Sequence, residues 1–166
     1  AFFPDAQIDF LLRKGNEAIL LHHPFLHEVL IWYKKEHKPR NLFRLIRLIR
    51  RNRYDKVVNL QRFAATGLLT AFSAAGETIG FDKNPFSFLF SKKISHIVGE
   101  EKKLHETERN LELIRHFTDP SYFRPVLYPS GSDEDFVKPF KLGKFITVSP
   151  ASVWFTKQYP ADQWIS

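Results

Sequence analysis

The chain has 166 residues, of which 43% are apolar and 26% charged; this composition excludes a disordered chain and allows one domain, or one domain and part of another. Cysteine is absent, which excludes disulfides, thiolate metal sites and cysteine nucleophiles, and no apolar run approaches the roughly 18 residues that would span a bilayer. The formal net charge is +7, and all of this excess lies in residues 1–116, because residues 117–166 carry five basic and five acidic side chains.

Strands and helices alternate along the first 117 residues. Short apolar runs predict strands at 7–12, 28–32, 56–60 and 77–81. Apolar residues at helical spacing predict helices at 17–21, 41–52, 66–75 and 106–117, with Thr66 as the cap and Gly76 as the stop of the third. A phenylalanine-rich loop covers 82–90. The alternation predicts an α/β fold with a mostly parallel sheet.

The composition changes near Thr118. Prolines and a run of acidic residues mark 118–143 as a linker, in which Ser130 or Ser132 could cap a short helix over 133–137. Residues 144–149 then predict a buried strand, followed by a loop. We therefore expect one α/β domain over 1–117, a linker over 118–143 and the start of a second α/β domain over 144–166.

The segment 34–53 carries nine basic side chains and one acidic one, Glu36. Its apolar residues form a stripe that predicts a core-facing helix, and its arginines recur on another face: Arg40, Arg44, Arg47 and Arg51. This face is either an ordinary solvated surface or a binding site for nucleic acid, anionic lipid or a phosphorylated substrate. Because glycines and exposed aromatics typical of nucleic-acid modules are missing beside it, an anionic acceptor or a membrane surface is favoured and no nucleic-acid partner is expected.

A candidate phosphate site follows the predicted strand at 144–149. In open α/β sheets ligands bind beyond the carboxyl ends of strands, and here Ser152, Thr156 and Lys157 supply two hydroxyls and a cation. The glycine spacing of a Walker loop is missing. The residues alone leave open both a phosphate-binding loop and an ordinary strand-to-helix turn.

Four stretches resemble one known family. The sequence SPASVWFTKQYPADQW at 149–164 resembles the donor-site signature of the ADP-heptose:lipopolysaccharide heptosyltransferases, in which Thr-Lys-Arg/Gln-Trp-Pro follows a loop of small residues. Three other stretches agree with the family in order and spacing: YDKVVNLQ at 54–61, TIGF at 78–81 and HETERNL at 105–111.

The resemblance implies a GT-B fold, in which two Rossmann-like domains, each a parallel sheet with flanking helices, enclose the active site. Residues 1–117 would then be the acceptor-side domain and 144–166 the start of the donor-binding domain. The implied reaction is an inverting, metal-independent transfer of a heptose from ADP-heptose to the lipopolysaccharide inner core, with no cofactor. The implied acceptor is anionic and sits at the cytoplasmic face of the inner membrane, so we expect a cytoplasmic protein, peripheral on the inner membrane.

The resemblance also assigns roles to residues. Lys157, Thr156 and Ser152 would bind the donor pyrophosphate. Four residues would face the acceptor: Gln61, Arg62, Arg109 and Asn110. For Arg62 and Arg109 a surface ion pair is the alternative role.

The family's catalytic base, an aspartate in a loop after its first strand, has no counterpart here. Asp5 and Asp9 fall in the wrong place, so we expect the base upstream of Ala1, a chain truncated at both ends, and no transfer by these 166 residues alone. His22, His23 and His27 lack metal-ligand spacing, so no metal site is expected. The alternative to an enzyme is a basic α/β module that binds anionic membrane or nucleic acid without catalysis.

Overall fold

A computed structural model of the chain describes residues 3–34, 38–97, 104–119, 121, 123–147, 152, 158 and 163. The chain divides into two compact units, Ala1–Tyr128 and Pro129–Ser166. The division falls inside the predicted linker 118–143, and the domain boundaries drawn from the sequence stay a prediction.

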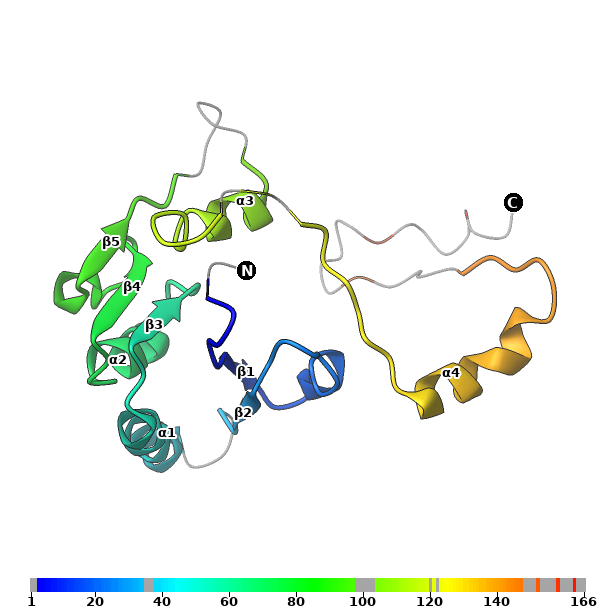
Figure 1. Cartoon of the computed structure of the whole chain (residues 1–166), viewed down its shortest axis with the longest axis horizontal. Helices are drawn as coiled ribbons and strands as arrows, with labels where there is room; N and C mark the ends of the chain where they lie inside the picture. The colour runs from blue at the N-terminus through cyan, green and yellow to red at the C-terminus, as the bar shows by residue number, and fades with distance from the viewer. Residues whose placement is uncertain are drawn as a thin grey trace. The chain divides into compact units, whose positions relative to one another are not determined.

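The first unit alternates strands and helices (Figure 1). Its elements, in chain order, are β1 (Asp9–Arg13), the 3₁₀ turn η1 (Glu17–Ile19), β2 (Glu28–Trp32), α1 (Lys38–Asn52), β3 (Lys56–Asn59), α2 (Ala64–Ala71), β4 (Glu77–Phe81), the 3₁₀ turn η2 (Ser87–Leu89), β5 (Lys92–Ile94) and α3 (Glu106–Leu111).

Every strand pair in the described residues is parallel. β1 pairs with β2, from Asp9 opposite Glu28 to Arg13 opposite Trp32. A second sheet has the order β3-β4-β5, with β4 in the centre. The predicted parallel α/β fold is therefore confirmed, as are the strands predicted at 7–12, 28–32, 56–60 and 77–81.

The side chains of β3 separate two hydrophobic clusters. Val57 packs against a cluster from β2, α1 and α2, whose buried members are Trp32, Leu45, Ile49 and Leu69. The next residue, Val58, packs against a cluster from β4 and the segment after α3, with Ile79, Phe81 and Leu113 at its centre. Because alternate residues of a strand face opposite sides, α1 and α2 cover one face of the β3-β4-β5 sheet and the α3 segment covers the other.

Several helices differ from their predicted ranges. The helix predicted at 17–21 is the 3₁₀ turn η1 (Glu17–Ile19), and the helix predicted at 41–52 begins at Lys38. The helix predicted at 66–75 begins at Ala64 and ends at Ala71; Thr66 is not its cap, because its hydroxyl donates back to the Phe63 carbonyl from inside the first turn. The chain leaves this helix before Gly76, since Ala74 has a φ of +56°. The helix predicted at 106–117 ends at Leu111, and tight turns with bonds between residues three apart carry the chain on to Phe117.

Two strands also differ. β5 (Lys92–Ile94) was not predicted, because it has one apolar residue. The strand predicted at 144–149 is wrong for residues 144–147, which are exposed and have no regular structure; residues 148 and 149 lie outside the described residues. A strand needs a neighbouring strand to pair with, and the described part of the second unit holds none, so residues 144–147 have no partner there.

The second unit contains α4 (Gly131–Val137) and η3 (Lys138–Lys141). Ser130 caps α4: its hydroxyl oxygen accepts from the Asp133 N–H at 3.2 Å, and the Asp133 carboxylate accepts from the Ser130 N–H at 2.8 Å. The predicted helix and its cap at Ser130 are therefore confirmed. Every helix in the described ranges is too short or too polar to cross a membrane.

Candidate functional site

Polar side chains end or follow all three strands of the β3-β4-β5 sheet. Asn59 ends β3, and its carboxamide oxygen accepts from the Gln61 N–H at 2.9 Å. Asp82 follows β4 and accepts from the backbone N–H of His96, the second residue after β5, also at 2.9 Å. Because the strands are parallel, these residues share one edge of the sheet, where α/β proteins bind ligands.

Asn84 holds two loops of this edge together. Its carboxamide nitrogen donates to the carbonyls of Gln61 and Phe63, both at 3.1 Å, and its oxygen accepts from the Phe86 N–H at 2.9 Å. The side chain is 2% exposed and lies against Gly67 of α2, where a Cβ would come within 2.1 Å of its oxygen. The loop after β3 is therefore fixed in place by a buried polar contact.

His96 follows β5, an outer strand, at this edge. It is 7% exposed, and its ring meets Phe81 edge-on at 4.7 Å between centroids. Burial lowers the pKa of its imidazole, and the positive charges of Arg62 and then Arg109 lower it further. Its Nδ1 has no hydrogen-bond partner in the described part of the chain. The imidazole is thus a buried, neutral group with one unused polar atom, beside two guanidinium groups.

Three of the four predicted acceptor-side residues lie around this edge. Gln61 and Arg62 are exposed on the loop after β3, and Arg62 has no hydrogen bond or ion pair with a described residue. Arg109 forms an ion pair with Glu106 at 3.1 Å, which is the contact that the alternative interpretation of this residue predicted. Its Nε nevertheless remains buried without a partner among the described residues.

Asn110 follows Arg109 on α3, and its Oδ1 is also buried and unpaired within the described ranges. Unpaired buried polar atoms are uncommon and call for a ligand, water or ion to complete them. The same state is shared by Trp32 Nε1 and Asn59 Nδ2, so it is not confined to the α3 segment.

The predicted donor loop lies mostly outside the described residues. Thr156 and Lys157 are among those not described. Ser152 is described and half-buried, and its carbonyl accepts from the Gln158 side chain at 2.7 Å. The pyrophosphate-binding role of the three residues stays a prediction.

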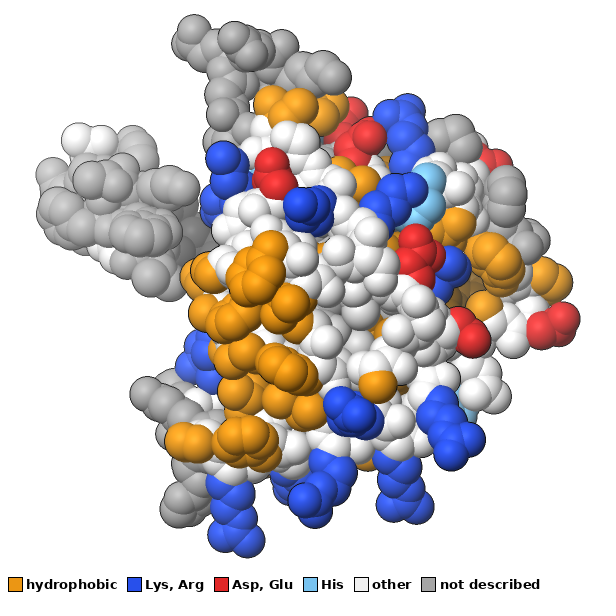
Figure 2. All heavy atoms as spheres, turned by 90° about the vertical axis from the view of Figure 1, so that its left-hand side faces the viewer, with side chains coloured by type: hydrophobic (Ala, Val, Ile, Leu, Met, Phe, Trp, Pro, Cys, Tyr) orange, Lys and Arg blue, Asp and Glu red, His pale blue; other side chains and the backbone are white. Residues whose placement is uncertain are grey.

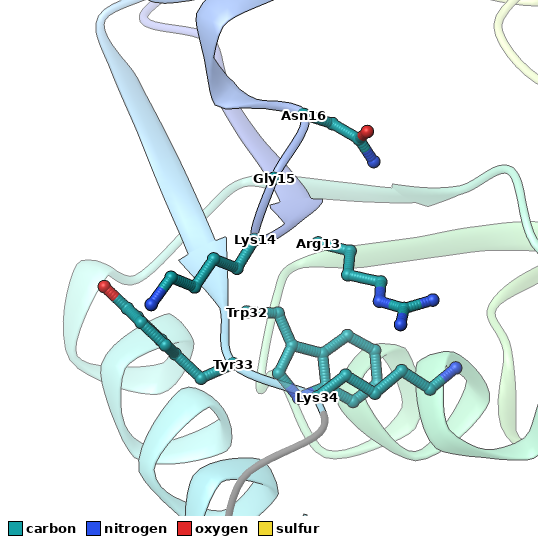
Figure 3. A pocket seen from close by; sticks show the side chains of 7 residues that line it. All are labelled: Arg13, Lys14, Gly15, Asn16, Trp32, Tyr33 and Lys34. Atoms are coloured by element: carbon teal, nitrogen blue, oxygen red, sulfur yellow. The ribbon is translucent and has the colours of Figure 1, made fainter.

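A basic cavity of about 320 Å³ lies at the carboxyl ends of β1 and β2 (Figure 3). The residues that line it come from the last position of each strand and the turn that follows: Arg13, Lys14, Gly15, Asn16, Trp32, Tyr33 and Lys34. Three are cations and none is acidic. Gly15 has a φ of +99°, which favours glycine in this turn. The cavity therefore suits a small anion.

Aromatic rings hold the cations of this cavity. The Lys14 ammonium lies 4.7 Å from the centre of the Tyr33 ring, and the Lys34 ammonium lies 5.2 Å from that of Trp32. Figure 3 shows Arg13 and Lys34 extending on the same side, next to the Trp32 ring. The Lys34 ammonium also lies 5.4 Å from the ring of Phe63, which follows Arg62 in the chain. Residues 62 and 63 thus connect the cavity with the surroundings of His96.

Asp9 has a structural role. Its carboxylate accepts hydrogen bonds from the Tyr54 hydroxyl and from His27 Nδ1, the latter at 2.9 Å. The expectation that Asp9 is not the base stays a prediction. Among the described residues, no group of three or more acidic or histidine side chains could hold a metal.

Several of these residues were not predicted. His96 follows β5, the strand that the sequence did not indicate. The cavity depends on the pairing of β1 with β2, which brings Lys14 to Trp32 through a backbone bond of 3.1 Å. Asn59 did have a signal, since a polar residue at the end of an apolar strand marks a possible ligand edge.

Comparison with known proteins gives one match. The model of glycosyltransferase family 9 (heptosyltransferase) matches residues 42–166. The matched range includes all four stretches on which the resemblance rests, 54–61, 78–81, 105–111 and 149–164. No curated protein matches the chain. No solved structure matches it either.

Proposed function

Because the chain belongs to glycosyltransferase family 9, the heptosyltransferase family, we propose that it serves the transfer of a heptose from ADP-heptose to the lipopolysaccharide inner core. Membership makes it a glycosyltransferase, whose partners are a nucleotide-sugar donor and an acceptor. The heptose, the adenine nucleotide and the lipopolysaccharide acceptor belong to the proposal. The observation that carries it is the match itself, which spans the polar edge of the β3-β4-β5 sheet and the predicted donor loop.

Charge supports an anionic acceptor on the N-terminal side. Five cations lie around the strand ends of the first unit: Arg13, Lys14, Lys34, Arg62 and Arg109. The Kdo carboxylates and phosphates of an inner-core acceptor would complement them.

For the donor we propose that Lys157 neutralises the pyrophosphate as it leaves, with Thr156 and Ser152 donating hydrogen bonds to its oxygens. Such a fixed positive charge stabilises the developing charge of the leaving group directly, so this inverting transfer would need no metal. The protein would work in the cytoplasm, at the inner-membrane surface where a lipid-linked acceptor lies.

Calorimetry with the full-length protein tests the proposal. We expect ADP-heptose to bind more tightly than ADP or other nucleotide sugars, and Lys157→Ala to weaken this binding. A soluble Kdo-containing acceptor should bind separately, and Arg62→Ala should weaken only that interaction. Lys138→Ala, an exposed lysine of η3, is the matched control for loss of one charge. Equal affinity for all nucleotides, or tight binding of DNA in their place, would contradict the proposal.

A further inference from the structure

The side chains that line the basic cavity extend in two directions (Figure 3). Arg13, Asn16 and Lys34 lie on one side of the strand ends, and Lys14 lies on the other. The strand register explains why Arg13 and Lys34 come together, because Arg13 is opposite Trp32 and Lys34 follows Trp32 by two residues. One side of the cavity therefore holds a guanidinium, an ammonium and a carboxamide from two separate turns.

The two cations on this side have no acidic partner. Arg13 and Lys34 form no ion pair and no side-chain hydrogen bond with a described residue. Glu17 follows Asn16 in the chain, but its carboxylate accepts from the Gly15 N–H at 2.5 Å and does not line the cavity. Two positive charges held side by side repel each other, so an anion between them would lower the energy of the folded protein.

The fold holds Lys34 in place before a ligand binds. Its backbone N–H donates to the Trp32 carbonyl at 2.9 Å, and its half-buried side chain lies against the rings of Trp32 and Phe63. Trp32 is 6% exposed and belongs to the core cluster. In contrast, Figure 2 shows Lys and Arg side chains that project separately into solvent along the lower border of that face. A cation fixed in advance loses less conformational freedom on binding, so the cavity is the better anion site.

We propose that Arg13 and Lys34 bind the phosphate group of a sugar phosphate monoester, with the Asn16 carboxamide as a further donor. A guanidinium forms two parallel hydrogen bonds with phosphate oxygens, and an ammonium adds a compact charge. Near pH 7 a phosphate monoester carries a charge of about −2, which the two cations balance. The Asn16 side chain is available because it does not cap η1, the turn that it precedes.

Charge and size favour this ligand over other anions. A carboxylate carries one negative charge, so it would leave one of the two cations unbalanced. The phosphodiesters of nucleic acids also carry one charge per phosphate. The cavity, at about 320 Å³, lies at the lower end of the roughly 300–1,000 Å³ that small-molecule sites occupy, so a sugar has room beside the phosphate.

The inference rests on the proposed function for the source of its ligand, because the sugar phosphate would be part of the acceptor. It goes further than an anionic acceptor, since it predicts that the protein distinguishes a phosphate monoester from a carboxylate. It assigns this choice to Arg13 and Lys34. Inorganic phosphate offers the same chemistry without a sugar and is therefore a separate probe.

Calorimetry of the full-length protein tests the inference with glucose 6-phosphate, glucuronate and inorganic phosphate. The first two probes carry the anion at the sixth carbon of the same sugar, one as a phosphate and the other as a carboxylate. We expect glucose 6-phosphate to bind at least tenfold more tightly than either of the other probes. Arg13→Gln/Lys34→Gln should weaken its binding on the order of a hundredfold, and Asn16→Ala severalfold, because hydrogen bonds between charged groups contribute more than those of a neutral donor.

Two controls locate the site. Lys14 lines the same cavity but extends to its other side, so Lys14→Gln should weaken binding less than Lys34→Gln. Lys138→Gln/Lys141→Gln removes two exposed lysines of η3 and matches the double variant in charge, so it should leave the affinity unchanged. Circular dichroism would establish that each variant is folded.

Four results would overturn the inference: glucuronate or inorganic phosphate binding as tightly as glucose 6-phosphate, unchanged affinity in the Arg13/Lys34 variant, an equal loss in Lys14→Gln, or an equal loss in the η3 control. The affinity for ADP-heptose is measured without these probes. Failure of the preference for ADP-heptose while glucose 6-phosphate binds as expected would contradict the proposed function alone. The reverse result would contradict the phosphate site alone.

Discussion

The contact between Gly67 and Asn84 allows a sharp test of how the polar edge is held. In the Gly67→Ala variant the new methyl group would lie 2.1 Å from Asn84 Oδ1 and 2.9 Å from its Cγ. Ordinary van der Waals contact begins at about 3.4 Å, so the Asn84 carboxamide must move by more than about 1 Å. Its hydrogen bonds to Gln61, Phe63 and Phe86 would then break or lengthen.

The expected loss of stability follows from these contacts. Three hydrogen bonds at roughly 0.5–1.5 kcal/mol each amount to about 1.5–4.5 kcal/mol. Alanine in a helix interior recovers about 1 kcal/mol relative to glycine. We therefore expect Gly67→Ala to lower the free energy of unfolding by about 0.5–3.5 kcal/mol, although alanine is the better helix former.

Urea unfolding followed by circular dichroism would measure this change. Gly131→Ala is the matched control, because Gly131 is also helical and a Cβ there would meet nothing within 4 Å. Combining Gly67→Ala with Asn84→Ala should cost less than the sum of the two single changes, since both remove the same bonds. Stability of Gly67→Ala equal to or above the wild type, or strict additivity in the double variant, would refute the reasoning.

Three further predictions concern ionisable groups. Burial and then the hydrogen bond to Asp9 raise the pKa of Tyr54 to about 12. The free energy of unfolding should therefore fall between pH 10 and 12, by up to about 2.7 kcal/mol less partial screening by solvent. In alkaline urea titrations the free energy of unfolding of Tyr54→Phe should fall less than that of the wild type. Burial lowers the pKa of His96, so the stability that its neutral form provides should be full above about pH 6.5 and should be lost as the pH drops. In thermal melts, the melting temperature of His96→Gln should depend less on pH in the acid range than that of the wild type. An identical dependence would contradict the assignment. In the full-length protein, Lys157→Ala should slow transfer from ADP-heptose about a hundredfold in a coupled assay, and unchanged kinetics would remove Lys157 from the site.

Local pattern predicted the elements whose burial is periodic. In α1 the stripe containing Leu45 and Ile49 marked a helix that the structure extends to Lys38. β3 and β4 are short apolar runs bounded by polar residues, and both were predicted. These signals are local because one face of each element, or both faces of a central strand, must be apolar.

Elements that depend on a partner were not predicted. β5 has the sequence KKI, and it becomes a strand because Ile79 to Phe81 of β4 present their backbone to it. His96 follows β5, so its place at the carboxyl edge was missed along with the strand. The basic cavity was missed for a similar reason, since Arg13 and Lys34 meet only when β1 and β2 pair. In contrast, the position of Gln61 and Arg62 after a strand was predicted, because β3 itself was predicted, and their acceptor-binding role stays a prediction.

The family stretches combine residues that build the fold with residues left for a ligand. In TIGF, a Cβ on Gly80 would lie 2.5 Å from the Phe90 ring, so glycine is needed there for packing. In HETERNL, His105 and Glu108 cap α3: Glu108 accepts from the His105 N–H at 2.7 Å, and His105 Nδ1 accepts from the Thr107 N–H at 3.3 Å.

The same stretch contains Arg109 and Asn110, whose Nε and Oδ1 are buried without partners in the described ranges. Buried unpaired atoms are not confined to this stretch, because Trp32 Nε1 of the hydrophobic core and Asn59 Nδ2 are in the same state. The predicted acceptor-binding role of Arg109 and Asn110 is therefore tested by substituting them. His105 and Glu108 are those whose loss should lower stability through the cap.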